Sequence, residues 1–177
     1  MQASNQDQTK GILAVLLDRD GVLNKNPGPG KYVRSWADWE WLPGAKETLG
    51  LFHQAGYRVV IITNQSGIAQ GLMTENALSN IHWNMKESAK AEGGKNLTIY
   101  HCPHVLANEC ECRKPKPGMI LQAQSDLGFD FENTYFIGDD ERDRQAGEAA
   151  GCPSIIVNNE VGLLEVARQI VNGAVYS

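Results

Sequence analysis

The chain has 177 residues, which is enough for one well-cored domain and short for two. Its 42% hydrophobic and 21% charged residues are typical of an ordinary globular protein. A formal net charge of -5 argues against a broad nucleic-acid-binding surface, which would need a basic face to release counterions. The composition therefore favours a small substrate, or else a basic patch that is very local.

Residues 1–10 are polar, and we expect them to form a flexible tail before a single domain over residues 11–177. The tail lacks the apolar stretch that a secretory signal needs behind its basic start. No run in the chain approaches the roughly 20 apolar residues of a membrane span. We therefore expect a cytoplasmic protein that does not enter a membrane.

The apolar run from Ile12 to Leu17 predicts a fully buried strand, and it stops abruptly at Asp18, Arg19, Asp20 and Gly21. Because side chains alternate along an extended chain, Asp18 and Asp20 should point one way and Arg19 the other. Two carboxylates this close repel unless a cation lies between them or one keeps its proton. A divalent metal site with a proton-transfer role is the main hypothesis, and a solvated loop is the alternative.

Helices and strands are expected to alternate along the rest of the chain. The predicted helices cover residues 43–55, 74–91, 117–127, a segment around 146–150, and 161–171, and the predicted strands cover 58–62, 97–100, 134–137 and 153–157. This alternation predicts an α/β fold with a doubly wound, Rossmann-like, mainly parallel sheet of five strands and helices on both faces. The aromatic segment over residues 32–41 should pack over the sheet edge or form a pocket wall, with Tyr32 and Arg34 as candidates for the latter.

Polar groups follow three of the predicted strands at their carboxyl ends. Asp18 and Asp20 follow the first, Thr63 the second and Asp139 the fourth. In a parallel sheet these ends share one edge, where ligands bind. Asp18, Asp20 and Asp139 offer the hard oxygen ligands that Mg²⁺ prefers.

Phosphate oxygens could be held by Thr63, by the backbone N–H groups of residues 64–67, and by Lys114. Together with the three aspartates, these groups describe phosphoryl transfer. One aspartate would attack phosphorus and the other would move the proton. The order along the strand suggests Asp18 as the nucleophile and Asp20 as the acid and base.

Three of the four cysteines crowd together with a histidine in the pattern CxHxxxxxCxC, made by Cys102, His104, Cys110 and Cys112. These are the ligand types of a closed, tetrahedral structural zinc site. Reduced thiols without metal, or a disulfide, are the alternative. His101 is a less favoured ligand because its side chain should point away from that of Cys102, and Cys152 should be a buried small hydrophobe.

Four stretches, DRDGVLN at 18–24, ITNQSGIAQG at 62–71, CRKPKPGM at 112–119 and GDDERD at 138–143, resemble the motifs of the haloacid dehalogenase (HAD) superfamily of phosphatases. The resemblance is closest to a capless, zinc-bearing subgroup with members acting on heptose bisphosphate or histidinol phosphate. It implies Asp18 as nucleophile, Asp20 as general acid and base, and Thr63 and Lys114 as stabilisers of the phosphoryl group. It also implies Mg²⁺ held by Asp18, Asp139 and the carbonyl of Asp20. The residues expected to bind substrate are Arg113, Asn64, Gln65, Ser66 and Tyr32.

The resemblance implies a small phosphorylated metabolite as the partner of the chain, and neither nucleic acid nor membrane. The expected substrate is a sugar phosphate such as D-glycero-D-manno-heptose 1,7-bisphosphate, which would lose its 7-phosphate. Histidinol phosphate is the alternative, because Gln70 and Asp140 stand here where the heptose bisphosphate phosphatases of this subgroup commonly carry basic residues, and because the zinc loop is short, as in the histidinol-phosphate enzymes. A polynucleotide 3′-phosphatase fits the net charge poorly, and a non-enzymatic zinc-stabilised binding module would leave the motifs as coincidence. The sequence assigns no oligomeric state.

The last expected zinc ligand, Cys112, directly precedes Arg113 and Lys114. Zinc would therefore fix the loop that presents both cations, without taking part in the reaction. With no large insertion after the first or second motif, no separate cap domain is expected.

Overall fold

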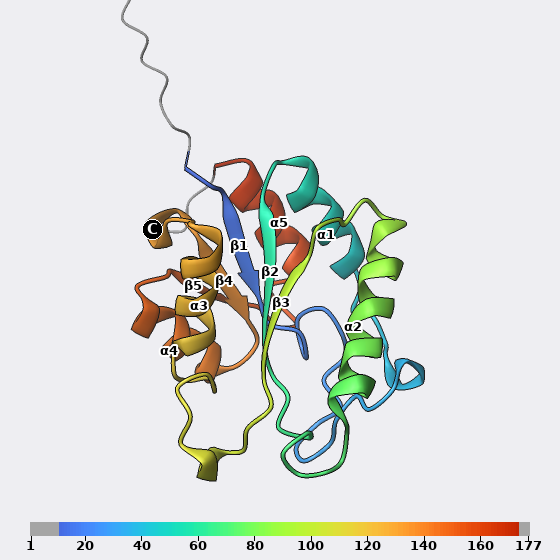
Figure 1. Ribbon diagram of the computed structural model, residues 1–177. Coiled ribbons are helices and arrows are strands. Elements are labelled where there is room, and N and C mark those ends of the chain that lie inside the picture. Colours follow the sequence, from blue (N-terminus) through green and yellow to red (C-terminus); the bar gives the residue numbers. More distant parts are fainter. Residues whose placement is uncertain (1–10, 174–177) are drawn as a thin grey trace, which may run out of the picture.

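The computed structural model describes residues 11–173, so the expected N-terminal tail lies outside the described part of the chain. Five parallel strands form one sheet in the order β3-β2-β1-β4-β5. Their bounds are Ala14–Leu17 (β1), Arg58–Asn64 (β2), Thr98–Cys102 (β3), Tyr135–Gly138 (β4) and Ser154–Ile156 (β5). The predicted doubly wound α/β architecture is confirmed, and the loops that follow the strands gather at the lower end of the molecule in Figure 1.

The central position of β1 explains its apolar sequence. It pairs with β2 on one side, Leu17 opposite Ile61, and with β4 on the other, Leu17 opposite Ile137. Both faces of β1 are covered, and all four of its residues are buried. A strand covered on both faces reads as a continuous apolar run, as this one does.

Helices cover both faces of the sheet (Figure 1). On one face, α1 (Ala45–Gln54), α2 (Glu75–Lys90) and α5 (Leu163–Val171) share a buried cluster with β1 and β2. On the other face, α3 (Gly118–Leu127) and α4 (Glu141–Ala150) pack against the opposite sides of the same strands. Among residues 11–173, no helix is both long and apolar enough to cross a membrane.

The predicted elements all form, with shifted ends. The first strand begins at Ala14, since Ile12 makes only an isolated bridge to Phe129. The third strand continues to Cys102, because β2 extends to Asn64 and supplies its partner. Thr74 is the N-cap of α2, and its side chain accepts a hydrogen bond from the Ala77 N–H. Pro117 stands just before α3 rather than inside it.

The aromatic segment contains the 3-10 helix η1 (Trp36–Asp38) and packs near α2. Trp36 and Trp39 stack with ring centroids 5.4 Å apart, and Trp41 meets Trp39 edge-on at 5.1 Å. The Trp41 indole N–H donates to the Ser88 hydroxyl of α2 at 3.1 Å. The three tryptophans thus extend the core on this face, while Tyr32 at the start of the segment faces the site described next.

Candidate active site and Cys/His cluster

A cavity of about 510 Å³ opens at the carboxyl ends of the strands. Apart from Gly67, the residues that the sequence suggested for binding Mg²⁺ or the phosphorylated substrate all line it. These residues are Asp18, Asp20, Tyr32, Thr63, Asn64, Gln65, Ser66, Arg113, Lys114 and Asp139. Segments distant in the sequence meet here because parallel strands deliver their ends to one edge.

Three carboxylates and one ammonium lie at the floor of this cavity. Oxygen atoms of Asp18, Asp139 and Asp143 all lie within 4.8 Å of one another. Lys114 Nζ is 2.8 Å from Asp18 Oδ1 and 2.6 Å from Asp143 Oδ1, and it also donates to the Ile62 carbonyl at 3.0 Å. One ammonium leaves two of the three negative charges uncompensated, so this set of hard oxygen donors fits a divalent cation.

Asp143 was missing from the expected site residues. It is 1% exposed and accepts hydrogen bonds from the backbone N–H groups of Asp139 and Asp140, both at 3.1 Å. The first turn of α4 therefore brings it back to the end of β4. Its place in the GDDERD stretch was visible, but three other acidic residues there gave no reason to select it.

The ionisation of the cluster reflects its burial and its charges. Burial raises the pKa of Asp18 to about 7, although Lys114 acts in the opposite direction. Burial and the neighbouring Asp143 raise the pKa of Asp139 to about 6. Burial would lower the pKa of Lys114, but Asp18 and Asp143 raise it above its usual value. A cation among these carboxylates would favour their charged forms.

Gly21 allows the backbone to pass very close to this cluster. A Cβ atom on Gly21 would lie 1.9 Å from Asp139 Oδ2, and the backbone there has a φ of 94°. Both the space and the conformation thus require glycine. This explains the glycine that follows the DRD sequence.

The Asp20 carboxylate is held away from the other three. Its oxygens accept hydrogen bonds from Asn24 Nδ2 at 2.9 Å and from Gln65 Nε2 at 2.8 Å, and Arg19 Nη2 lies 2.9 Å away. Burial would raise the pKa of Asp20, but the Arg19 guanidinium and the two amide donors together hold it below its usual value. In the expected set of Mg²⁺ ligands, Asp20 contributes its backbone carbonyl and not this carboxylate.

The expectation that Arg19 would point away from both aspartates is wrong for Asp20. The extended strand ends at Leu17, and the N–H groups of Leu23 and Asn24 donate to the Arg19 carbonyl as the chain turns. The alternation of side chains therefore stops before Arg19. Its side chain is completely buried and returns to Asp20.

Two of the expected substrate-binding residues use their side-chain amides inside the protein. Asn64 donates to the Lys114 carbonyl at 3.0 Å and accepts from the Lys114 N–H at 3.1 Å. Gln65 bridges Asp20 and the Thr63 hydroxyl, both at 2.8 Å. These amides thus hold Lys114, Asp20 and Thr63 in position. The Gln65 backbone N–H is also used within the protein, so the N–H groups of Ser66 and Gly67 are the ones in this turn that could meet a ligand.

Tyr32 docks its loop onto the turn after β2. Its hydroxyl lies 3.1 Å from Ser66 Oγ and accepts a hydrogen bond from Gln70 Nε2 at 2.6 Å. The ring lies against Gly67, where a Cβ atom would be 3.0 Å from the Tyr32 ring. Gln70, one of the two departures from the subgroup pattern, is therefore part of a neutral hydrogen-bonded wall beside the cavity.

Asp140, the other departure, has a local structural role. It is the N-cap of α4, accepting from the Arg142 N–H at 2.9 Å, and it pairs with the Arg142 guanidinium at 2.7 Å. Hydrogen bonds to Arg142 hold the pKa of Asp140 below its usual value, although burial opposes them. Arg142 itself lines the cavity, as do Lys31 and Arg113.

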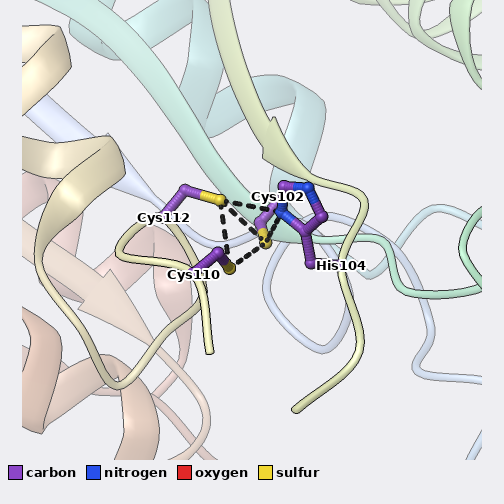
Figure 2. Close-up of side chains that lie close together, drawn as sticks. All are labelled: Cys102, His104, Cys110 and Cys112. Carbon is purple, nitrogen blue, oxygen red and sulfur yellow. Dashed lines mark hydrogen bonds between the residues drawn. The ribbon is translucent and has the colours of Figure 1, made fainter. Parts of the chain in front are cut away.

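The four Cys and His residues of the CxHxxxxxCxC pattern come together, as Figure 2 shows. Cys102 Sγ lies 3.1 Å from Cys112 Sγ and 3.6 Å from Cys110 Sγ, and His104 Nδ1 lies 3.2 Å from Cys112 Sγ. A tetrahedral zinc ion with Zn–S bonds of about 2.3 Å separates its sulfur ligands by roughly 3.8 Å, so the set is close to that geometry. His101 takes no part, since its Nε2 lies 3.0 Å from Glu75 Oε2.

The cluster is directly connected to the cavity. Arg113 Nη1 donates to the His104 carbonyl at 3.0 Å, and the Gln65 N–H donates to the Cys102 carbonyl at 2.7 Å. The register places Asn64 opposite Cys102. Cys152 lies elsewhere, buried as predicted, with its thiol donating to the Thr134 carbonyl at 2.9 Å.

Comparisons with known proteins agree on the class of this fold and site. A family model described as HAD-hydrolase-like matches residues 111–172. A crystal structure of D,D-heptose 1,7-bisphosphate phosphatase from B. bronchiseptica, complexed with magnesium and phosphate, superposes with a TM-score of 0.83 at 31% identity, covering 92% of this chain and 99% of that one. The fold and cavity are thus those of a HAD phosphatase, a hydrolase of phosphoric monoesters.

Sequence relatives define the family more narrowly. The D-glycero-beta-D-manno-heptose-1,7-bisphosphate 7-phosphatase of Pseudomonas aeruginosa is 34% identical over 90% of this chain and 88% of its own length. The D-glycero-alpha-D-manno-heptose-1,7-bisphosphate 7-phosphatase of Campylobacter jejuni is 43% identical over 83% of each chain. The chain belongs to the family of HAD phosphatases that includes these enzymes.

Proposed function

We propose that this protein is a Mg²⁺-dependent phosphomonoesterase that works through an aspartyl-phosphate intermediate. The observation that carries the proposal is the buried contact of Asp18 with Lys114, 2.8 Å apart, in a cavity that also holds Asp20 and the Thr63 hydroxyl. A carboxylate nucleophile next to a fixed cation suits attack on phosphorus. Asp20 is the candidate for proton transfer. Arg19 and the amide donors lower its pKa in the free protein, and the negative charge of a bound phosphate ester would raise that pKa and favour the protonated form that the first step needs.

The reaction proceeds in two steps. An oxygen of Asp18 forms a bond to phosphorus, the ester P–O bond breaks, and the leaving alkoxide takes a proton from Asp20. Asp20 then takes a proton from water, whose oxygen attacks the phosphorus of the aspartyl-phosphate, releasing inorganic phosphate and the Asp18 carboxylate. Lys114 and the Thr63 hydroxyl bind the phosphoryl oxygens on which negative charge is concentrated.

Asp18, Asp139 and the carbonyl of Asp20 would hold Mg²⁺, with Asp143 beside them as a hydrogen-bond and charge partner. When bound, the ion neutralises carboxylate charge and polarises a phosphoryl oxygen. We also propose that Cys102, His104, Cys110 and Cys112 hold a structural zinc ion. Four protein ligands leave no open position on that ion, so its role is to fix the loop before Lys114.

For the substrate we propose a sugar phosphate such as D-glycero-D-manno-heptose 1,7-bisphosphate, hydrolysed at its 7-phosphate. The names of the relatives support this, as do the cationic side chains of Lys31 and Arg113 at the cavity, which suit a second phosphate. Histidinol phosphate remains the second candidate. Gln70 and Asp140 stand where the heptose enzymes commonly carry basic residues, and neither provides a cation for a second phosphate. We retain a single domain over residues 11–177 and the cytoplasm as predictions.

The test is phosphate release with and without Mg²⁺ from heptose 1,7-bisphosphate, other sugar phosphates, histidinol phosphate and a 3′-phosphorylated oligonucleotide. We expect Mg²⁺-dependent release with the highest kcat/KM for the heptose bisphosphate. A higher kcat/KM for histidinol phosphate would reassign the substrate. Release that needs no divalent cation would contradict the proposed chemistry.

A further inference from the structure

Arg19 is a completely buried arginine whose role the reaction above does not define. It is among the largest fully buried side chains of the described residues. Its Nη2 atom lies 3.1 Å from Asp20 Oδ1 and 2.9 Å from Asp20 Oδ2, so one nitrogen contacts both oxygens of the carboxylate. The guanidinium therefore constrains how the Asp20 carboxylate is rotated.

The other side of the guanidinium is held by α2. Arg19 Nη1 lies 3.2 Å from Nε2 of His82, a buried residue of that helix. The Trp39 ring lies beside the same group, with its centroid 5.7 Å from Arg19 Cζ. Because Arg19 Nε has no hydrogen-bond partner among residues 11–173, the hydrogen bonds that fix the plane of the guanidinium in this part of the chain are those at Nη1 and Nη2.

His82 is suited to accept from Arg19. Burial and then the Arg19 charge lower the pKa of His82 to about 3, so the imidazole is neutral and can offer a lone pair at Nε2. A second histidine, His101, lies edge-on to His82 with ring centroids 6.1 Å apart, but its own Nε2 meets Glu75. His82 thus connects α2 to Asp20 through a single intermediate, whereas His101 does not.

We infer that Arg19 and His82 are positioning residues that orient the Asp20 carboxylate for proton transfer to the leaving group. The inference rests on the proposed role of Asp20. Removal of the His82 acceptor leaves a buried N–H without a partner, so the guanidinium must turn to find another. Any such turn moves the nitrogen that contacts both Asp20 oxygens.

The test compares two substrates of similar shape that differ in the basicity of the leaving group. Phenyl phosphate releases a more basic oxygen than p-nitrophenyl phosphate, so its cleavage depends more on a general acid. The parameter kcat/KM reports the steps up to the first irreversible one, here the transfer to Asp18 with loss of the leaving group. For His82→Phe we expect kcat/KM to fall about tenfold with phenyl phosphate and about twofold with p-nitrophenyl phosphate.

Two variants make the result specific. His82→Gln places an amide oxygen where Nε2 lies, and it should return the ratio of the two kcat/KM values to near that of the wild type. His101→Phe changes the neighbouring histidine, whose Nε2 meets Glu75 rather than Arg19. This variant should leave the ratio unchanged. Because both substrates are measured on the same preparation, a fraction of misfolded protein cancels from the ratio.

Asp20→Asn separates this inference from the proposed function. It should lower kcat/KM on the order of a hundredfold with phenyl phosphate and much less with p-nitrophenyl phosphate. If Asp20→Asn shows this difference and His82→Phe does not, the positioning role of Arg19 and His82 is wrong while the role of Asp20 stands. If Asp20→Asn shows no difference, the proton-transfer role of Asp20 fails, and this inference fails with it.

Discussion

The carboxylate cluster and the Cys/His cluster adjoin each other but are built in different ways. Asp18 and Asp139 follow central strands, and Asp143 is fixed in the first turn of α4 by two backbone N–H groups. In the Cys/His cluster only Cys102 belongs to a strand. The other three ligands lie on residues 104–112, whose one regular element is the 3-10 helix η2 (Leu106–Asn108).

This difference indicates which of the two clusters needs a bound metal ion to keep its shape. The ends of β1 and β4, the first turn of α4 and the Lys114 ammonium hold the three carboxylates together by contacts within the protein. Residues 104–112 are held by hydrogen bonds from nearby residues such as Arg113 and Lys116 rather than by a strand or an α-helix, so metal–ligand bonds would add much of their order. We therefore expect removal of Mg²⁺ to abolish the reaction but keep the site, and removal of zinc to loosen the loop.

The largest expected effect is at the carboxylate cluster itself. Asp18→Asn replaces the proposed nucleophile by an amide of similar size, and phosphate release should fall by about a thousandfold or more. Phosphate release in the presence of saturating Mg²⁺ measures this, with circular dichroism to verify the fold. Activity at the wild-type level would refute the covalent mechanism for any substrate.

Asp143→Asn tests how far the protein alone holds this cluster. The change removes one charge partner of the buried Lys114, which should cost about 3 kcal/mol of unfolding free energy and lower kcat by about a hundredfold. Urea unfolding and phosphate release measure the two effects. Glu148→Gln, which removes an exposed ion pair on the same helix, is the matched control and should change stability and kcat very little. Similar losses in both variants would contradict the special role of Asp143.

Zinc removal tests the second cluster. Protein that is stripped of zinc by a chelator and then resupplied with Mg²⁺ should lose about tenfold in kcat, because a loosened loop displaces Lys114 from the phosphoryl group. Its affinity for Mg²⁺ should stay unchanged. Full activity in protein shown by metal analysis to contain no zinc would disprove the coupling.

Cysteine variants extend this test. Cys110→Ser should lower the zinc content and reproduce the loss of activity. Cys152→Ala should retain zinc, because Cys152 is not one of the four residues whose ligand atoms come together, and its thiol contacts the Thr134 carbonyl instead. A zinc content that falls equally in both variants would argue against the assignment of the four ligands.

The smallest expected effect concerns the residue that connects the two sites. Asn64→Ala removes both hydrogen bonds to the Lys114 backbone, and kcat should fall roughly fivefold, from a loss near 1 kcal/mol. Asn64→Asp keeps an acceptor for the Lys114 N–H and should lose less. Asn84→Ala, which removes a half-buried asparagine of α2 bonded only within its own helix, is the control. If only KM changes in Asn64→Ala, Asn64 binds the substrate directly, as the sequence first suggested.

The sequence predicted most of the fold because its signals are local. The apolar run before Asp18 requires a strand covered on both faces, and the Cys/His spacing allows one compact metal site. The strand ends and the four motifs then supplied the residues expected at the cavity, except Tyr32, which lies in the aromatic segment outside the motifs.

The missing parts depend on where side chains turn once the chain is folded. The return of Asp143 to β4, the turn of Arg19 toward Asp20, and the use of the Asn64 amide on Lys114 all join segments through contacts that no spacing encodes. His82 is the clearest case. It lies in a helix with no motif, and only the packing of α2 against the sheet brings it to Arg19.

The contact of Tyr32 with Gly67 constrains how this site can change during evolution. A Cβ atom at position 67 would require the Tyr32 ring, which belongs to the loop that carries Lys31, to shift by a few tenths of an ångström. A residue larger than alanine at position 67 should therefore be accepted more easily when position 32 holds a smaller residue. Among homologues we expect these two positions to vary as a pair.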